Sequence, residues 1–279
     1  MPAAAQGQRP SPTGAAPPPA EMRYLFGSGE AAALSEQAYN ALVDHVRIFL
    51  DSRRAAPGPR RSVVLAPGAT LDDPQTLPCG DKPPAAVFDM DETAVLNLGY
   101  EYDEARTGVH STDARWLRWE RTGADKVAAV PGAARAFDEL RRLGVTVIVN
   151  TNRDAAAAAE TERALAIAGL GAFRHGDTLF LKGDADGKSG KDGRRAEIAR
   201  RFCVVAMGGD QLGDFTDLFG KPKTAERRAW TMSAALHGFF GRFWFVLPNP
   251  VYGSGLAGNW DDIFPKDKRW TDPGPEGGK

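Results

Sequence analysis

Short apolar runs alternate with longer amphipathic stretches along most of this chain. Runs of this length, bounded by polar or turn-forming residues, are typical of buried strands, and we predict them at residues 85–90, 145–150, 179–181, 202–207 and 243–247. Apolar residues at helical spacing predict helices at residues 30–52, 131–143, 154–168 and 192–201. Strands that alternate with helices favour the α/β class, as a three-layer α/β sandwich with a central parallel sheet.

Residues at the ends of two predicted helices support their boundaries. Pro131 stands at the start of one helix and Gly144 just after its end, which is the usual order of these residue types around a helix. Asp154 has a suitable side chain for the N-cap of the next helix, and Gly169 closes that helix.

Both ends of the chain have compositions that cannot build a core. The first twenty residues hold six Pro and six Ala, and we expect a disordered leader over residues 1–23. A second polar tail is expected over residues 265–279. No secretory signal, with its basic start and apolar run, is visible here. Two alternatives follow: a cytoplasmic protein, or a signal upstream of this numbering.

The overall charge and hydrophobicity exclude several classes of protein. With 35 Lys and Arg against 36 Asp and Glu, the formal net charge is −1, which does not favour a nucleic-acid polymer or an acidic membrane surface as a partner. Hydrophobic residues are 42% of the 279 residues and charged residues 25%, so a bundle of transmembrane segments is excluded. We expect one large domain, or one domain with an inserted cap, and a homo-oligomer is possible.

Cysteine usage limits the covalent cross-links. Cys79 and Cys203 are the two cysteines, so a framework of several disulfides is excluded. We predict two free or buried thiols, with a single bridge in an oxidising compartment as the alternative.

Chemically reactive side chains follow the predicted strands. Ligands bind open parallel sheets at the carboxyl ends of the strands, so residues directly after a strand are the candidates for function. These residues are Asp89, Asp91, Glu92 and Thr93 after the first strand, Thr151, Asn152 and Arg153 after the second, and Asp210, Gln211 and Asp214 after the fourth. A turn with Lys188 and Lys191 lies between the third and fourth strands. Carboxylates, a hydroxyl and a cation are therefore expected at one edge.

This set of side chains fits the needs of phosphoryl transfer. Asp89 can take a phosphoryl group as an acyl phosphate, and Asp91 can protonate the leaving oxygen and later activate water. Asp89 and Asp210 offer the oxygen ligands that Mg²⁺ prefers. Thr151 and Lys191 can hold the phosphate oxygens as charge develops.

Longer segments around these residues form an ordered series of motifs. They are GSGEAAALSEQAYN (27–40), DMDETAVLN (89–97), Trp116 with Trp119, PGA (131–133), TNR (151–153), KSGK (188–191), GGDQLGDF (208–215) and LPNPVYG (247–253). DMDET, TNR, KSGK and GGDQLGDF resemble the four motifs of the haloacid dehalogenase superfamily of phosphohydrolases. The whole series, over about residues 24–260, resembles the class C bacterial acid phosphatases, lipoprotein-type enzymes that act on 5′-nucleotides and other phosphomonoesters.

The resemblance implies a mechanism and a set of site residues. It implies a Mg²⁺-dependent acid phosphatase that hydrolyses small phosphomonoesters, with 5′-nucleotides among them, through an aspartyl-phosphate intermediate. Asp89 would be the nucleophile and Asp91 the acid and base, while Thr151 and Lys191 would bind phosphate. The implied metal ligands are Asp89, the Asp91 backbone carbonyl, Asp210 and, as an additional ligand or a residue behind the others, Asp214.

The sequence departs from the usual pattern of that family at several places. Gln211 stands where Asn is usual, and Gly255 stands where Trp is common. The loop before the lysine turn is enlarged, so Lys182 and Lys188 are alternatives to Lys191 as the cation that binds phosphate.

Aromatic residues between the first two motifs have two interpretations. Trp116 and Trp119 lie one helical turn apart, where an aromatic pair usually belongs to a core. They can instead stack on a flat leaving group such as a nucleobase, together with Tyr252 from the loop after the last strand. The candidates for substrate binding are these three residues with Asn152 and Arg153.

The motifs also suggest how the chain is divided. The expected parts are the leader at 1–23, a helical segment packed on the core at 24–84, a phosphohydrolase core at 85–97 and 130–264, a small and mainly helical cap at 98–129, and the tail at 265–279. Resemblance to secreted enzymes favours the periplasm or an envelope anchor, with the cytoplasm as the alternative.

Two further classes of function remain open. One is another enzyme on the same scaffold, a phosphomutase or a dehalogenase; Asp91 argues against dehalogenation, which has no alkoxide to protonate, but not against a mutase. The other is a non-catalytic module that binds a nucleotide or a haem-type group. The combination of Asp89 with Asp91, Thr151 and Asp210 argues against it, because a binding protein needs no nucleophile with an acid.

Overall fold

A central sheet of parallel strands organises the computed structural model, which describes residues 17–55, 60–185, 189–272 and 274. In spatial order the strands are β7 (Leu179–Lys182), β6 (Thr146–Asp154), β3 (Pro84–Phe88), β8 (Cys203–Gly209) and β9 (Trp244–Val246). At the carboxyl end of β3, Phe88 pairs with Val149 of β6 and Gly208 of β8. The residues that follow β3 therefore lie beside the ends of two neighbouring strands.

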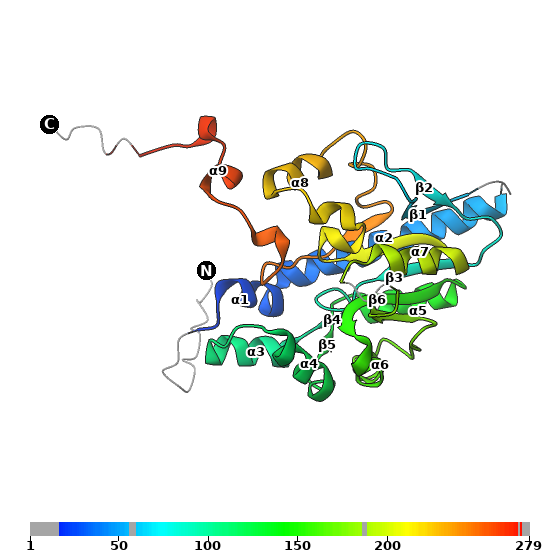
Figure 1. The fold of residues 1–279 in the computed structure, drawn as a ribbon, viewed down its shortest axis with the longest axis horizontal. Helices are drawn as coiled ribbons and strands as arrows, with labels where there is room; N and C mark the ends of the chain where they lie inside the picture. The colour runs from blue at the N-terminus through cyan, green and yellow to red at the C-terminus, as the bar shows by residue number, and fades with distance from the viewer. Residues whose placement is uncertain (1–16, 56–59, 186–188, 273, 275–279) are drawn as a thin grey trace, which may run out of the picture.

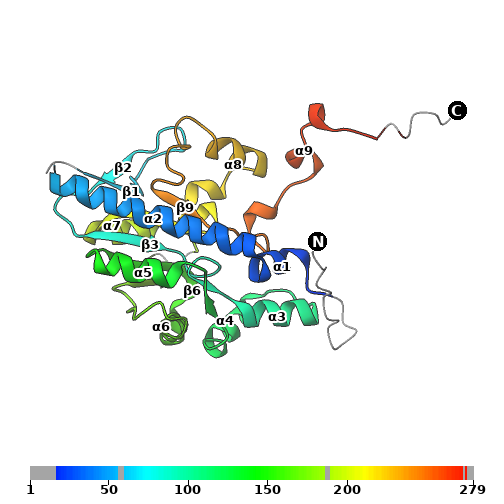
Figure 2. The ribbon, with the colours of Figure 1, turned by 180° about the vertical axis from the view of Figure 1, so that it is seen from behind.

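Helices cover both faces of this sheet and give three layers (Figures 1 and 2). They include α2 (Gly29–Ala55) and α5 (Ala133–Arg142) on one face and α7 (Asp192–Arg201) on the other. Neighbouring residues of β3 point into different cores: Phe88 packs with Leu42 of α2 and Phe137 of α5, whereas Val87 shares a core with Ile198 of α7. The predicted three-layer α/β sandwich is confirmed.

All the predicted strands and helices are present, with one shift that affects the site. β6 is longer than the predicted run and extends to Asp154. Thr151, Asn152 and Arg153 therefore belong to the strand instead of following it, and alternate residues leave it on opposite faces. Thr151 and Arg153 are buried, whereas Asn152 is exposed.

The predicted helix ends are also confirmed. Asp154 accepts a hydrogen bond from the Ala156 backbone N–H at 2.8 Å and opens a short 3-10 turn, η1 (Ala155–Ala157), that leads into α6 (Ala158–Ile167). Gly144 and Gly169 follow α5 and α6 with φ of 76° and 75°, a conformation that glycine adopts without strain.

Two helices stand between β4 and β5, near the carboxyl edge of the sheet. They are α3 (Leu98–Thr107) and α4 (Asp113–Thr122), and the strands on either side of them are β4 (Val95–Leu96) and β5 (Ala128–Ala129). β4 and β5 pair in antiparallel fashion. Because of this pairing, the chain leaves the core and returns to it at neighbouring points.

The N-terminal part differs from the prediction in two ways. Helix α1 (Ala20–Gly27) begins inside the predicted leader, so the leader at 1–23 was drawn too long; residues 1–16 lie outside the described residues. The segment predicted as helical also contains a small antiparallel sheet of β1 (Arg61–Leu65) and β2 (Thr76–Pro78). Ser62 of β1 donates a hydrogen bond to the Val204 carbonyl of β8 at 3.1 Å, which attaches this sheet to the core.

The chain beyond β8 is built of short elements. They are η2 (Leu212–Asp214), η3 (Asp217–Gly220), α8 (Thr224–Thr231), η4 (Ser254–Leu256), α9 (Trp260–Ile263) and η5 (Lys266–Lys268). Of the predicted tail, residues 273 and 275–279 lie outside the described residues. Within the described ranges, no helix combines the length and apolar character needed to cross a membrane.

Cys79 and Cys203 form a disulfide, so the prediction of two thiols was wrong and the single bridge is correct. Cys79 follows β2 directly and Cys203 is the first residue of β8, and both side chains are buried. The bond joins residues 124 positions apart and connects the small sheet to the central one. Sequence spacing could not show this proximity, because the crossovers between the strands create it.

We expect this disulfide to contribute substantially to stability. Replacing both Cys79 and Cys203 with Ser should lower the free energy of unfolding by roughly 2–5 kcal/mol, because the bond restricts a long loop of the unfolded chain. Urea unfolding with and without a reducing agent measures the effect. The reducing agent should weaken the wild-type protein and leave the double variant unchanged. Detection of two reactive thiols in the unreduced, denatured protein would contradict the bond.

Candidate active site

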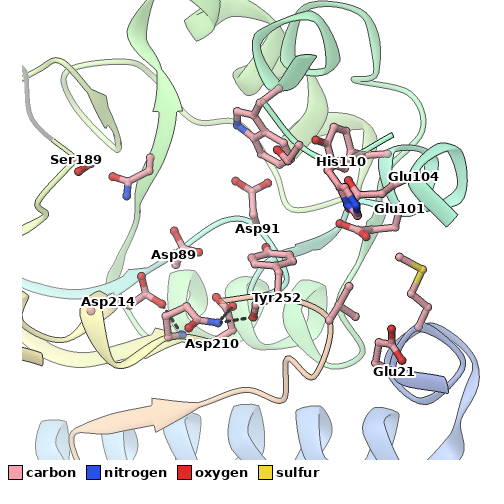
Figure 3. A pocket seen from close by; sticks show the side chains of 18 of the residues that line it. Glu21, Asp89, Asp91, Glu101, Glu104, His110, Ser189, Asp210, Asp214 and Tyr252 are labelled. Carbon is pink, nitrogen blue, oxygen red and sulfur yellow. Dashed lines mark hydrogen bonds and ion pairs between the residues drawn. The ribbon is translucent and has the colours of Figure 1, made fainter. Parts of the chain in front are cut away.

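Asp89 and Asp91 stand at the carboxyl end of β3, where the chain turns sharply. The Met90 carbonyl accepts a hydrogen bond from the Ala94 backbone N–H at 2.8 Å, and Glu92 adopts the left-handed conformation with φ of 53°. The turn directs both aspartate side chains into the same cavity (Figure 3).

Three carboxylates meet at this edge of the sheet. One oxygen from each of Asp89, Asp210 and Asp214 lies within 4.8 Å of the others. Asp89 follows β3, Asp210 follows β8, and Asp214 belongs to η2, so the parallel register of β3 and β8 creates the cluster. Asp89 and Asp210 are each only 9% exposed.

Burial and mutual repulsion oppose ionisation of this cluster. Burial raises the pKa of Asp89 well above its ordinary value; the Lys191 ammonium counteracts this, and Asp214 and Asp210 add to it. Burial likewise raises the pKa of Asp210 to about 7, with a further contribution from Asp214. The cluster therefore attracts additional positive charge.

The Lys191 ammonium bridges two of these carboxylates. Its Nζ donates to Asp89 Oδ1 and, at 2.7 Å, to Asp214 Oδ1. Burial alone would lower the pKa of Lys191, but the Asp214 and Asp89 carboxylates overcome burial and raise it. At the start of α7, the Lys191 backbone N–H donates to Asp217 Oδ1 at 2.8 Å, which fixes the position of the residue.

The shorter hydrogen bonds to Asp91 all go to one of its two carboxylate oxygens. Its Oδ1 accepts hydrogen bonds from Arg153 Nη2 at 2.8 Å, Arg153 Nε at 3.0 Å and Asn97 Nδ2 at 3.0 Å. Its Oδ2 has longer contacts, with Arg153 Nε at 3.4 Å and Thr151 Oγ1 at 3.5 Å. Oδ1 thus already accepts several hydrogen bonds within the protein, whereas Oδ2 can take part in a further one.

Asp210 is held by residues from three different segments. Thr93 Oγ1 donates to its Oδ1 at 3.0 Å, and Asn249 Nδ2 and Gln211 Nε2 donate to its Oδ2 at 2.8 and 3.0 Å. Asn249 was not among the predicted site residues. Because it follows β9 closely, the rule that functional residues follow strands could have identified it.

A buried network behind the site was also missed. The Tyr252 hydroxyl donates to Glu92 Oε2, and the Asn97 backbone N–H donates to Glu92 Oε1 at 2.9 Å. Burial, with a further contribution from Asp91, raises the pKa of Glu92 to about 8. In sequence Glu92 looked like one more acid after a strand, and its fully buried position follows from the tight turn.

The carboxylates and Lys191 open onto a cavity of about 740 Å³. The predicted site residues that line it are Asp89, Asp91, Trp116, Asn152, Lys191, Asp210, Asp214 and Tyr252. Glu101 and Glu104 of α3 and residues of α1 line the opposite side. The cavity therefore extends from the edge of the sheet to the helices before β5.

Three predicted residues do not line this cavity. Arg153 is 1% exposed and lies behind Asp91, and the Thr151 hydroxyl accepts a hydrogen bond from the Arg153 backbone N–H at 3.2 Å. Trp119 packs so closely against Gly123 that a Cβ there would lie 2.1 Å from its ring. Trp119 is half-buried and packs within the helical segment, as the interpretation of the aromatic pair as part of a core predicts.

Of the two lysines that were alternatives to Lys191 for binding phosphate, the structure describes one. Lys182 ends β7 and is not among the residues that line the cavity. Lys188 lies outside the described residues.

Known structures share this fold. The class C acid phosphatase from Bacillus anthracis with tungstate bound gives a TM-score of 0.65 at 23% identity and covers 88% of this chain and 89% of that chain. A second structure of the class C acid phosphatase from Bacillus anthracis gives a TM-score of 0.65 at 24% identity, with 84% of each chain covered. The chain therefore shares the α/β fold of these two structures.

Sequence similarity shows which family this chain belongs to. Residues 36–255 match the family described as HAD superfamily, subfamily IIIB (acid phosphatase), and the chain belongs to this family. It is also 28% identical to "Acid phosphatase 1" of Solanum lycopersicum over 174 residues, which is 60% of this chain and 57% of the tomato protein. The chain thus matches little more than half the length of that relative.

The ion pair between Arg153 and Asp91 yields a prediction about stability. Replacing Arg153 with Met should lower the free energy of unfolding by about 3–5 kcal/mol, because the partner carboxylate stays buried without its cation. Urea unfolding provides the measurement. Arg54→Met is the matched control, because the Arg54–Asp51 pair is 75% exposed on both sides and its loss should change little. Equal stability of wild type and Arg153→Met would contradict the assigned role.

Proposed function

We propose that this protein is a Mg²⁺-dependent acid phosphatase that hydrolyses phosphomonoesters through an aspartyl-phosphate intermediate on Asp89. The observation that carries the proposal is the placement of Asp89 and Asp91 on one turn, facing a cavity that Lys191, Asp210 and Asp214 also line. Membership of an acid phosphatase family supports it.

The carboxylate cluster fits a hard divalent cation. Asp89, Asp210 and Asp214 bring three buried carboxylates together, and the Lys191 ammonium balances only one of their charges. Oxygen donors of this kind are the ligands that Mg²⁺ prefers. We assign Asp89 and Asp210 as ligands, with the Asp91 backbone carbonyl, and Asp214 as an additional ligand. A bound cation would offset the repulsion between the carboxylates and a phosphate.

In the first chemical step, an Asp89 carboxylate oxygen attacks phosphorus, and the bond from phosphorus to the leaving oxygen breaks. Asp91 gives its proton to that oxygen, and Oδ2 is the atom assigned to carry the proton because Oδ1 is committed to Arg153 and Asn97. Lys191, which contacts Asp89, stabilises the negative charge on the phosphoryl oxygens.

In the second step, Asp91 accepts a proton from water, and the water oxygen attacks phosphorus. The bond between phosphorus and Asp89 breaks, which releases inorganic phosphate and restores both carboxyl groups. Thr151 does not itself line the cavity, but its Oγ1 lies 3.5 Å from Asp91 Oδ2, and we assign this hydroxyl to a phosphoryl oxygen that comes close to the Asp91 carboxylate.

The leaving group would occupy the far part of the cavity. We assign residues 98–129 as a cap over the site, and 5′-nucleotides as substrates. Trp116 and Tyr252 line the cavity and offer aromatic surface to a base, with Asn152 beside the phosphate end. Base stacking on aromatic side chains contributes about 1–3 kcal/mol per base. We leave Trp119 out of this slot, because its ring packs against Gly123 and does not line the cavity.

Removal of the metal or of the nucleophile tests the proposal. Hydrolysis of p-nitrophenyl phosphate and 5′-AMP should stop after chelation and return with Mg²⁺. Asp89→Asn should be folded but inactive, because an amide is a poor nucleophile and a neutral ligand.

Asp44→Asn, which neutralises an exposed carboxylate on α2, is the matched control and should retain full activity. Activity that survives chelation would overturn the metal requirement. Turnover by Asp89→Asn would overturn the nucleophile.

Loss of the acid should depend on the leaving group. Asp91→Asn should slow turnover of 5′-AMP by about 10²–10⁴-fold, because the amide cannot protonate the leaving alkoxide. The loss should be smaller for p-nitrophenyl phosphate, whose leaving group needs no proton. Comparison of kcat for the two substrates gives the answer, and equal losses would show that Asp91 is not the leaving-group acid.

A further inference from the structure

The side of the cavity opposite Asp89 is acidic. Glu101 and Glu104 of α3 line it, together with Glu21 of α1 (Figure 3). The proposed mechanism gives no role to these three glutamates. A phosphate group belongs beside Lys191, so this wall faces the part of the substrate that departs as the alcohol.

Glu101 differs from its neighbour Glu104 in having no partner. Glu104 Oε2 is paired with Arg115 Nη1 at 3.1 Å. Glu101 is 5% exposed, and among the described residues no hydrogen bond or ion pair to its carboxylate is present. Burial raises the pKa of Glu101 to about 7, Glu104 adds to this, and Arg115 partly opposes it.

The Glu101 carboxylate faces the cavity and has no protein donor among the described residues, so a donor has a defined place to come from. A hydrogen bond to an ionised carboxylate is stronger than one between neutral groups. Glu101 lines the cavity, so a group bound there can supply the missing hydrogen bond. The Trp116 ring lines the same cavity, and an aromatic surface together with a carboxylate suits a flat or cationic nitrogen group.

We propose that Glu101 is a specificity-determining residue that accepts a hydrogen bond from an N–H group of the leaving group. The preferred substrates would be phosphomonoesters whose leaving group carries an amino group, either the exocyclic amine of a base or an alkylammonium. Leaving groups without such a donor would bind with the Glu101 carboxylate still unsatisfied. The inference rests on the proposed phosphatase function.

Two pairs of substrates that differ by one amino group test the proposal. The first pair is 5′-AMP and purine riboside 5′-monophosphate, and the second is O-phosphoethanolamine and ethyl phosphate. At a pH above about 7, where Glu101 is ionised, the wild-type protein should show about tenfold or higher kcat/KM for the amino compound in at least one pair, because a hydrogen bond to a charged group is among the stronger ones. A preference in the first pair identifies a base amine, and one in the second an alkylammonium.

Matched variants then assign the preference to one side chain. Glu101→Met removes the acceptor and should bring the ratio of kcat/KM within each pair close to one. Asp44→Asn removes a carboxylate charge from an exposed position on α2 that does not line the cavity, and should keep the ratio within about twofold of wild type. Melting temperatures confirm folding, and Glu101→Gln provides a second variant of unchanged size, in which a neutral acceptor should weaken the preference.

The outcomes separate this proposal from the proposed function. A wild-type protein that hydrolyses p-nitrophenyl phosphate but shows no preference in either pair would overturn the role of Glu101 alone. A preference that survives in Glu101→Met would do the same. Absence of any phosphatase activity in the wild-type protein with Mg²⁺ would overturn both.

Discussion

Repulsion among buried carboxylates is the constraint on which the site depends. Asp89, Asp210 and Asp214 lie together where water is largely excluded, and the protein supplies one ammonium group, from Lys191, against them. Such an arrangement is unfavourable in a low-dielectric interior unless more positive charge arrives. The surrounding framework must therefore hold the cluster in place, and the parallel register and the turn after β3 contribute rigidity near it. The disulfide acts at the other end of β8, where Cys203 begins the strand.

The two ends of the cavity differ in how their charges are satisfied. At the sheet end, neutral donors from Thr93 and Asn249 and the Lys191 ammonium hold the carboxylates in fixed orientations. At the helical end, Glu101 is 5% exposed and has no such donor among the described residues. The two ends of the cavity therefore offer different partners to a bound molecule: carboxylates in fixed orientations with one ammonium group at the sheet end, and an acceptor that still lacks a donor at the helical end.

The sequence by itself determined the architecture and the edge of the sheet at which most of the predicted polar side chains lie. Apolar runs bounded by polar residues identified all the strands of the central sheet, because strands buried on both faces need continuous apolar side chains. The carboxyl-end rule then identified Asp89, Asp91 and Asp210, since parallel strands bring their ends to a common edge. Very short strands such as β1 and β2 were missed because three to five residues carry too little periodicity.

Only the tertiary structure decided how side chains far apart in the sequence are partnered. It joined Cys79 to Cys203, packed Trp119 against Gly123, and placed Asn249 on Asp210. It also paired Glu104 with Arg115 and left Glu101 without a donor from the described part of the chain, although both are ordinary acids on one predicted helical segment. Residue type fixes what a side chain can bind, but its partners depend on distances that the crossovers and the packing of the layers create.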